Sequence, residues 1–288
     1  MISNHVDQFL NWYFASFPIE RGKWRVWELL RRYGQPTRGL SVVKSIGDGI
    51  TMKLNLDEYI DRFIYYWSCF EPNETWVLKR LLRPGDTFVD VGANIGYFTL
   101  LASRLVGPRG KVIAFEAAPP TLARLEENVA LNPGLENISI HGCAVANTSG
   151  TIRIGKSFAG GSGTSSIRVN ERTEQVWNVP VVSLDQVLAD ERMIRVVKID
   201  VEGAELLVLK GFIDHLTPAS APDVFCEVDS DALLRELGGC VAELYRLMID
   251  LGYHAYDCHN LAFSAIGLEE VRRLDGVKVL FSKRLLAQ

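Results

Sequence analysis

The sequence lacks the patterns that mark disulfide-linked, zinc-binding and membrane-spanning proteins. Its five cysteines are widely scattered and none belongs to a Cys-x-x-Cys pair, so we expect reduced thiols in the core. No stretch reaches about 18 consecutive uncharged apolar residues, the length that crosses a bilayer. No apolar run follows a basic start, because Asp7, Glu20 and Arg21 interrupt the N-terminal segment. These absences predict a cytoplasmic protein that acts without a membrane.

An excess of positive charge is also missing. The formal net charge is −4, which gives no basic footprint, so nucleic acid is not an expected partner. Hydrophobic residues make up 48% and charged residues 23% of the chain, a balance typical of globular proteins. With 288 residues, the chain is long enough for a large core with a smaller added domain.

Residues 1–80 are predicted to form an N-terminal helical cap with a short β-hairpin. The first forty residues are rich in aromatics and arginines, and they fit two amphipathic helices that break near Pro18 and Gly34. Alternation of apolar and polar residues from Ser41 to Leu56 indicates the hairpin. We expect the helices to pack on the core or to join two copies of the chain as a homo-oligomer. A membrane-surface helix is less favoured, because acidic residues are interspersed.

The segment from Glu58 to Phe70 is strongly aromatic and is predicted to be helical. Two interpretations of its rings stay open. They can stack on a sugar or on a planar acceptor, or they can pack into the core, which we favour. The residues concerned are Tyr59, Phe63, Tyr65, Tyr66 and Trp67.

Residues 81–288 alternate between strand and helix patterns, which predicts a mainly parallel sheet with helices on both faces. The segment 146–180 departs from this pattern, because it is rich in glycine, serine and threonine, and we expect a β-rich insertion. Its glycine-rich tip is either a plain connection, which we favour, or a lid. Asp185 is expected to cap the short helix that follows. The short connection between the last two strands indicates a final antiparallel pair.

The most informative stretch is Thr87–Thr99, TFVDVGANIGYFT, which predicts a buried strand, a tight turn and the start of a helix. A helix start beyond the end of a sheet strand is a ligand site. Gly92 and Gly96 stand four positions apart, and we expect them to let a ligand approach the backbone. This spacing differs from the G-x-G-x-x-G pattern, in which a glycine makes room for a pyrophosphate.

Two acidic residues narrow the choice of ligand. Asp90 precedes the turn, where a carboxylate repels phosphate and attracts an ammonium group. Glu116 ends the next predicted strand, where a ribose diol is bound in folds of this kind. A ligand with an ammonium group, a ribose and no pyrophosphate is S-adenosylmethionine. The alternative is a tight turn that binds no ligand.

Carboxylates end four of the predicted core strands, which suits a cationic ligand better than four helix caps: Asp90, Glu116, Asp200 and Glu227. Methyl transfer to oxygen needs alignment of donor and acceptor and a group that takes the acceptor's proton. The catalytic candidates are Asp200, Glu202 and Glu227, which can equally serve as hydrogen-bond partners.

Histidines and metals are weaker candidates for this chemistry. Any of three histidines near strand ends can act as the base, although a lone histidine is more often structural: His141, His254 and His259. No metal is expected, because no histidine or asparagine with suitable spacing accompanies Asp200 and Glu202.

Five segments within residues 70–230 resemble the FkbM-type S-adenosylmethionine-dependent methyltransferases. They are PGDTFVDVGANIGYFTLLAS (84–103), VIAFEAAP (112–119), CAVANTSG (143–150), VPVVSLDQVL (179–188) and VVKIDVEGAELLVLKG (196–211). The combination of DVGANIG with KIDVEGAE is more specific than either motif alone. One departure is Ala117, where members of the family usually have proline; it should alter the turn and leave the ribose contact.

The resemblance implies a Rossmann-like seven-stranded, mostly parallel sheet with an antiparallel final strand. It also implies O-methylation of a hydroxyl on a sugar or natural-product acceptor, with a small molecule or carbohydrate as the partner. By the resemblance, six residues contact the cofactor: Asp90, Gly92, Asn94, Gly96, Glu116 and Ala144. Asp200 and Glu202 would lie at the reaction centre. Two alternatives remain, an N-methyltransferase of the same fold and a non-catalytic scaffold that binds the cofactor.

Overall fold

The computed structural model describes residues 4–16, 23, 25–27, 39–157, 164–166, 175–191, 193–228, 239–258, 262–273 and 277–286. The described chain divides into two compact units, one up to Pro72 and one from Asn73 onward. Helix α4 (Pro72–Leu81), which the sequence placed with the N-terminal region, begins at this division. None of the helices in the described ranges is long and apolar enough to cross a membrane.

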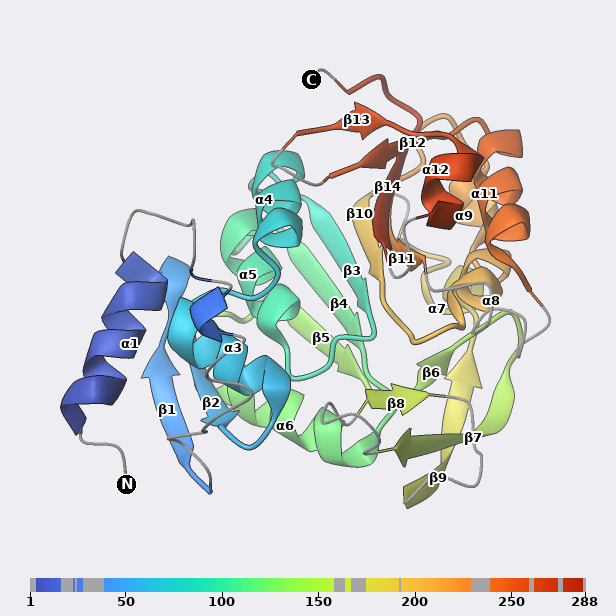
Figure 1. Ribbon diagram of the computed structural model, residues 1–288. Coiled ribbons are helices and arrows are strands. Elements are labelled where there is room, and N and C mark those ends of the chain that lie inside the picture. Colours follow the sequence, from blue (N-terminus) through green and yellow to red (C-terminus); the bar gives the residue numbers. More distant parts are fainter. Residues whose placement is uncertain are drawn as a thin grey trace. The chain divides into compact units, whose positions relative to one another are not determined.

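In the described part of the first unit, two helices flank a hairpin in sequence, and residues 25–27 are also helical (Figure 1). These are α1 (Asn4–Ser16), the antiparallel strands β1 (Ser41–Ser45) and β2 (Thr51–Asn55), and α3 (Tyr59–Trp67). The short 3-10 helix η1 (Gly47–Gly49) makes the hairpin turn, where Asp48 adopts a φ of 60°. The strands lie where alternation predicts them. Most of the second helix expected before residue 40 lies outside the described residues.

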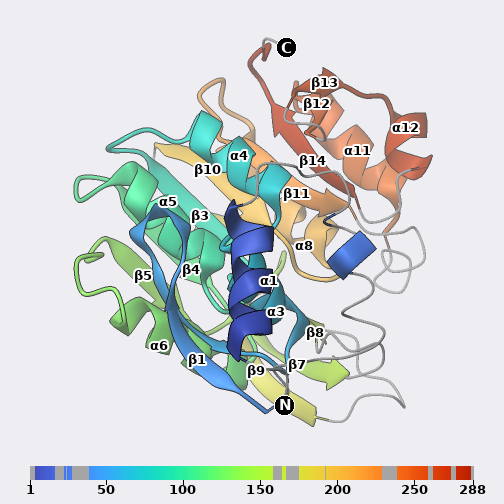
Figure 2. The same ribbon diagram turned by 60° about the vertical axis from the view of Figure 1, so that its left-hand side comes forward.

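Aromatic rings form the core of the first unit. Phe14 of α1 packs edge-on against Trp27 and Tyr66, with ring centroids 6.0 and 5.9 Å apart. Trp27 also meets Phe63 edge-on at 5.7 Å, and all four rings are buried. Figure 2 shows α1 in front of α3. Much of the aromatic segment at 58–70 therefore serves as core, because a helix of this composition gains more by burying its rings than by exposing them.

The second unit is built on an eight-stranded sheet in the order β13-β12-β14-β11-β10-β3-β4-β5. Strands β5, β4, β3, β10 and β11 are parallel, and β14 is antiparallel to both of its neighbours. Their bounds are β3 (Thr87–Val91), β4 (Lys111–Phe115), β5 (Ile138–His141), β10 (Ile194–Ile199), β11 (Asp223–Val228), β12 (His254–Asp257), β13 (Ser264–Ala265) and β14 (Val277–Ser282). The Rossmann-like prediction is confirmed, with the short β13 as an added edge strand.

The strand order reverses between β3 and β10, because the chain builds β4 and β5 on one side of β3 and later places β10 and β11 on the other. In open sheets of this kind, ligands bind at the reversal, beyond the carboxyl ends of the parallel strands. We call this side of the second unit the carboxyl edge. We therefore expect the candidate carboxylates to lie at this edge.

Helices cover both faces of this sheet (Figure 1). On one face Val89, Val91 and Ile199 join an apolar core with residues of five helices: α7 (Leu184–Val187), α8 (Glu205–Lys210), α9 (Ile213–Leu216), α11 (Val241–Asp250) and α12 (Leu268–Arg273). The other face carries α5 (Tyr97–Val106) and α6 (Pro119–Ala130). Because side chains alternate along a strand, Asp90 and Lys198 point to the α5 face, where the Lys198 Nζ lies 5.1 Å from the Phe98 ring.

The β-rich insertion forms a separate four-stranded sheet in the order β6-β9-β7-β8. Its strands are β6 (Ala144–Val145), β7 (Gly150–Ser157), β8 (Thr164–Ser166) and β9 (Gln175–Val182). β9 pairs antiparallel with β7 and parallel with β6. The glycine-rich tip, and with it the choice between lid and connection, lies outside the described residues.

The prediction that Asp185 caps α7 is wrong. Ser183 is the N-cap, in an extended conformation, and its side chain accepts a hydrogen bond from the Gln186 N–H. Asp185 lies inside the first turn and reaches the start of α9 instead. There its carboxylate accepts from the Asp214 N–H at 3.1 Å and contacts the His215 ring at 2.8 Å. The cap falls on the residue whose backbone leaves the helix, which a sequence pattern does not resolve.

We expect Phe281→Ala to lower the free energy of unfolding by about 3–5 kcal/mol, because Phe281 of β14 is fully buried in the core between sheet and helices. Urea denaturation of the full chain measures the change. The matched control is Leu285→Ala, a side chain 82% exposed, for which we expect a change within about 0.5 kcal/mol. Equal effects of the two changes would contradict the described packing of β14.

Candidate active site

The turn after β3 is held in a conformation that few residues adopt. Gly92, Asn94 and Gly96 have φ values of 82, 51 and 92°. The N–H groups of Gly92 and Ala93 both donate to the Phe115 carbonyl of β4 at 3.0 Å. Helix α5 begins at Tyr97, directly after Gly96. The turn is therefore fixed against the neighbouring strand before any ligand is considered.

The glycines in this turn make room for the protein itself. A Cβ on Gly92 would lie 1.9 Å from the carbonyl oxygen of Asp200, and a Cβ on Gly96 would lie 2.5 Å from Leu125 Cδ1. Both positions also have a positive φ, which disfavours other residues. Close packing within the protein is therefore one reason for both glycines. The expectation that they let a ligand approach the backbone stays a prediction.

Asp90 lies inside β3 and is fully buried. Its Oδ2 accepts a hydrogen bond from the Thr99 hydroxyl at 2.6 Å, whereas its Oδ1 has no hydrogen-bond partner among the described residues. Burial raises the pKa of Asp90, and the opposing effects of the Lys198 charge and the Thr99 hydrogen bond are smaller. A buried carboxylate oxygen without a partner is costly, so this atom is suited to a hydrogen-bond donor from outside the chain.

Glu116 directly follows β4 and is 8% exposed. Its Oε2 accepts from the Asn94 N–H at 2.9 Å and its Oε1 from the Ala118 N–H at 2.8 Å. Burial raises the pKa of Glu116, while these backbone hydrogen bonds act in the opposite direction. Ala117 also donates a backbone hydrogen bond to this carboxylate, which a proline could not do. The departure from the family pattern thus adds a donor to Glu116.

Ala144 begins β6 beyond the end of β5 and is buried against Ala118. At the end of β5, the His141 ring stacks on Phe115 with centroids 4.9 Å apart. The second unit therefore gathers Asp90, Glu116 and Ala144 along the carboxyl edge of β3, β4 and β5.

Asp200 follows β10 on the other side of the reversal, and its N–H donates to the Val91 carbonyl at 3.0 Å. Glu202 lies two positions later in the turn, with a φ of 56°. The sequence analysis overlooked Glu205, which is fully buried and accepts from the N–H groups of Val201 at 3.2 Å and Gly203 at 3.0 Å. The sequence feature that could have identified Glu205 is its position in the first turn of α8, where a carboxylate is favoured.

Two lysines at the same place were also missed. The Nζ of Lys198 lies 2.9 Å and that of Lys278 3.3 Å from Asp200 Oδ2. Lys198 is 3% and Lys278 9% exposed. The signal for Lys198 was a charged residue inside the apolar run VVKI, two positions before Asp200 and so on the same face. Nothing in the sequence linked Lys278 to Asp200.

These lysines set the protonation of Asp200. Burial alone would raise the pKa of the Asp200 carboxyl, but the positive charges of Lys198 and then Lys278 outweigh it and hold this pKa well below its usual range. The Asp200 carboxylate also shares a hydrogen bond with the side chain of Glu227 in β11. Glu227 in turn faces Lys278 in the register of β11 and β14.

The histidine candidates lie in different parts of the chain relative to the carboxyl edge. His141 lies at the carboxyl end of β5, and burial lowers its pKa. His254 begins β12, which runs in the direction of β11, and it therefore lies at the opposite edge of the sheet. His259 lies outside the described residues. Among the described residues, no group of three or more His, Cys, Asp or Glu side chains could hold a metal ion.

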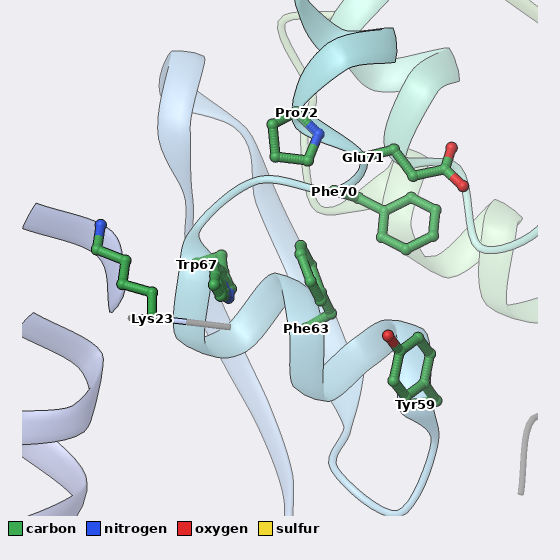
Figure 3. A pocket seen from close by; sticks show the side chains of 7 residues that line it. All are labelled: Lys23, Tyr59, Phe63, Trp67, Phe70, Glu71 and Pro72. Atoms are coloured by element: carbon green, nitrogen blue, oxygen red, sulfur yellow. The ribbon is translucent and has the colours of Figure 1, made fainter. Parts of the chain in front are cut away.

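The first unit contains a pocket of its own, with a volume of about 390 Å³ (Figure 3). Tyr59, Phe63 and Trp67 line it from one side of α3, at positions separated by four residues. The rings of Phe63 and Trp67 are parallel, with centroids 4.9 Å apart. The remaining lining residues are Lys23, Phe70, Glu71 and Pro72. Part of the aromatic segment at 58–70 thus lines a hollow and part of it is core.

Comparison with known proteins gives the family. Residues 90–254 match the methyltransferase FkbM domain. Methyltransferase sdnD of Sordaria araneosa is 34% identical over 141 residues, which cover 49% of this chain and 52% of that protein. The hexuronic acid methyltransferase AglP of Haloferax volcanii is 34% identical over 145 residues, which cover 49% of this chain and 56% of that protein.

The matched segments thus span little more than half the length of these two relatives. A solved FkbM methyltransferase from Methylobacillus flagellatus aligns with a TM-score of 0.46 and 16% identity over 72% of this chain and 50% of that one. The domain match carries the assignment, because it extends over more than half of the 288 residues. The chain therefore belongs to the FkbM methyltransferase family.

Proposed function

We propose that the protein is an S-adenosylmethionine-dependent O-methyltransferase that acts on a hydroxyl of a small-molecule or carbohydrate acceptor. Membership of a methyltransferase family supports the reaction class. The relative from Haloferax volcanii is named a hexuronic acid methyltransferase, which supports a carbohydrate acceptor. The net charge of −4 agrees with an acceptor other than nucleic acid.

The observation that carries the cofactor proposal is the buried Oδ1 of Asp90, which has no hydrogen-bond partner in the described chain. An ammonium group beside it would supply both a hydrogen bond and a compensating charge. S-adenosylmethionine carries such a group, and when bound it supplies a methyl group on a positively charged sulfur. We place its amino-acid end at Asp90 for this reason.

Glu116 and the turn would hold the rest of the cofactor. A carboxylate has about four lone-pair sites, so Glu116 can accept ribose hydroxyls in addition to its backbone N–H donors. Gly92, Asn94 and Gly96 fix the turn beside it, and Ala144 offers a small apolar side chain at the end of β5 for the adenine.

We expect Asp90→Asn to weaken S-adenosylmethionine binding by roughly ten- to hundredfold, because a charged hydrogen bond contributes about 1.5–3 kcal/mol. Titration calorimetry on the full chain measures it, with NAD as the competing cofactor. Asp250→Asn, an exposed aspartate on α11, is the matched control and should bind normally. Tight binding of NAD without binding of S-adenosylmethionine would contradict the proposed cofactor.

The Asp90→Asn variant should be more stable than the parent protein at pH 7. The pKa of Asp90 is raised by burial, so its ionised form destabilises the fold at neutral pH. The penalty is absent below 3.8, the ordinary aspartate pKa, and develops as the pH rises through the folded-state pKa. Thermal unfolding of Asp90→Asn should therefore show a gain at pH 7 that disappears in acid. A loss of stability at pH 7 would mean that the ionised Asp90 is stabilising.

Cofactor affinity should fall as the pH falls, because Asp90 and Glu116 accept hydrogen bonds from the cofactor only as carboxylates. Burial raises the pKa of Glu116 above its ordinary value of 4.5, so the loss should begin at a pH above that value. Calorimetry across pH tests this, and Glu116→Gln should weaken binding and remove part of the pH dependence. The exposed Glu126→Gln on α6 is the control. A flat profile in the parent protein would count against both carboxylates as ligands.

Mass spectrometry of the methylated product separates the reaction classes. With amino sugars and their hydroxyl analogues offered together, we expect the methyl group on oxygen. A methyl group found only on nitrogen would replace the O-methyltransferase proposal by an N-methyltransferase of the same fold.

A further inference from the structure

Four charged side chains meet at the carboxyl edge where β10, β11 and β14 run side by side. They are Lys198 and Asp200 from the β10 strand and its end, Glu227 from β11 and Lys278 from β14. Both lysine nitrogens contact the same Asp200 oxygen, Oδ2, at 2.9 and 3.3 Å. Asp90 of β3 pairs with Lys198 in the strand register and adds a further carboxylate to this face.

Stability does not account for this cluster. Burying an ion pair costs hydration that the attraction between the charges rarely exceeds, and apolar side chains of similar size usually serve as well. The opposite face of the same strands shows the apolar solution, with Val197, Ile199 and Cys226 in the large core. Charges on this face therefore call for a chemical explanation.

The two carboxyl groups of the cluster have different surroundings, because both lysine nitrogens contact Asp200. A hydrogen bond between two carboxyl groups needs a proton on one of them. The two ammonium groups on Asp200 favour its ionised form, so the shared proton belongs to Glu227. A carboxylate that already faces two ammonium groups is a poor proton acceptor, because accepting a proton would forfeit both interactions.

The lysines favour an ionised Glu227 as well. With Asp200 and Glu227 both ionised, these two carboxylates face two ammonium groups, and Asp90 lies beside them as a third carboxyl group. Lys278 is placed for this, since it is the register partner of Glu227 and lies 3.3 Å from Asp200 Oδ2. Glu227 is half-buried near the end of β11, whereas Lys198 and Lys278 are buried.

We propose that Glu227 takes the proton of the acceptor hydroxyl, and that Lys198 and Lys278 are positioning residues that assign this task to Glu227 by holding Asp200 ionised. The assignment of the proton acceptor rests on the proposed function. In the step, the acceptor O–H bond breaks and its proton goes to Glu227. The oxygen forms a bond to the methyl carbon, and the carbon–sulfur bond breaks with its electron pair returning to the positively charged sulfur. Glu227 must first have released the proton that it shares with Asp200.

The first test needs neither cofactor nor acceptor. Carbon-13 NMR of the side-chain carboxyl groups in the full chain follows the two residues across pH, with Asp200→Asn and Glu227→Gln to assign the signals. We expect Asp200 to titrate below Glu227. In Lys278→Met the titration of the pair should move to higher pH by about one unit or more, because an ammonium group has been lost. Lys198→Met should behave alike, and it replaces Lys278→Met if that variant does not fold.

The control for the lysines is Lys210→Met. Lys210 pairs with Glu243 at 2.7 Å on the surface, with 39% of its side chain exposed, so its loss should leave the carboxyl titration unchanged. Titration of Asp200 above Glu227, or an unchanged titration in both lysine variants, would overturn the positioning role.

The second test measures how turnover depends on pH. Its substrate is the acceptor that mass spectrometry shows to be methylated. Glu227→Gln should lower kcat by about 10²–10⁴ and remove the acid limb of the profile. Asp200→Asn should keep that limb and move it to lower pH, because a neighbouring negative charge is gone. Lys278→Met should move the limb to higher pH in parallel with the NMR titration, at an unchanged KM for the donor, and Lys278→Arg should restore it.

The outcomes separate this inference from the proposed function. The opposite ranking, with the limb lost in Asp200→Asn and kept in Glu227→Gln, would make Asp200 the proton acceptor and overturn the assignment. Absence of any methyl transfer, together with the expected NMR titrations, would overturn the proposed function and the proton-acceptor role. The effect of the lysines on Asp200 would then stand by itself.

Discussion

The close contact between Gly92 and the Asp200 carbonyl joins the two halves of the sheet. The Asp200 N–H binds the Val91 carbonyl at 3.0 Å, and a side chain on Gly92 would collide with the Asp200 oxygen. This contact lies where the strand order reverses, so it sets the distance between the ends of β3 and β10. Every candidate carboxylate of the second unit is placed by one of these two halves.

The two halves use opposite physical effects on their carboxyl groups. On one side Asp90 and Glu116 are buried away from water, and burial raises the pKa of each. On the other side Asp200 is partly buried, but two lysines reverse the effect of burial and lower its pKa. A site with an incompletely satisfied carboxylate on one side and a compensated pair on the other can bind a cation and handle a proton separately.

Most of the framework could be predicted from local patterns. Alternating strand and helix signals give the Rossmann-like sheet, because each element must bury one apolar face and so shows its period in the sequence. The positions of Asp90, Glu116, Asp200 and Glu227 follow from the same reasoning, since the end of a buried strand is visible where the apolar run stops. The packing of these glycines against Asp200 and Leu125 could not be predicted, because both neighbours are distant in sequence.

The sequence by itself determined the order of the elements, the turn after β3 and the acidic residues at the strand ends, because these depend on neighbours within a few positions. Only the tertiary structure decided which charges meet. Lys278 stands far along the chain from Asp200 and reaches it because β14 inserts antiparallel between β11 and β12. Asp185 likewise serves α9 instead of its own helix. Electrostatic partners act through space, and the fold brings them together across separations that no local pattern records.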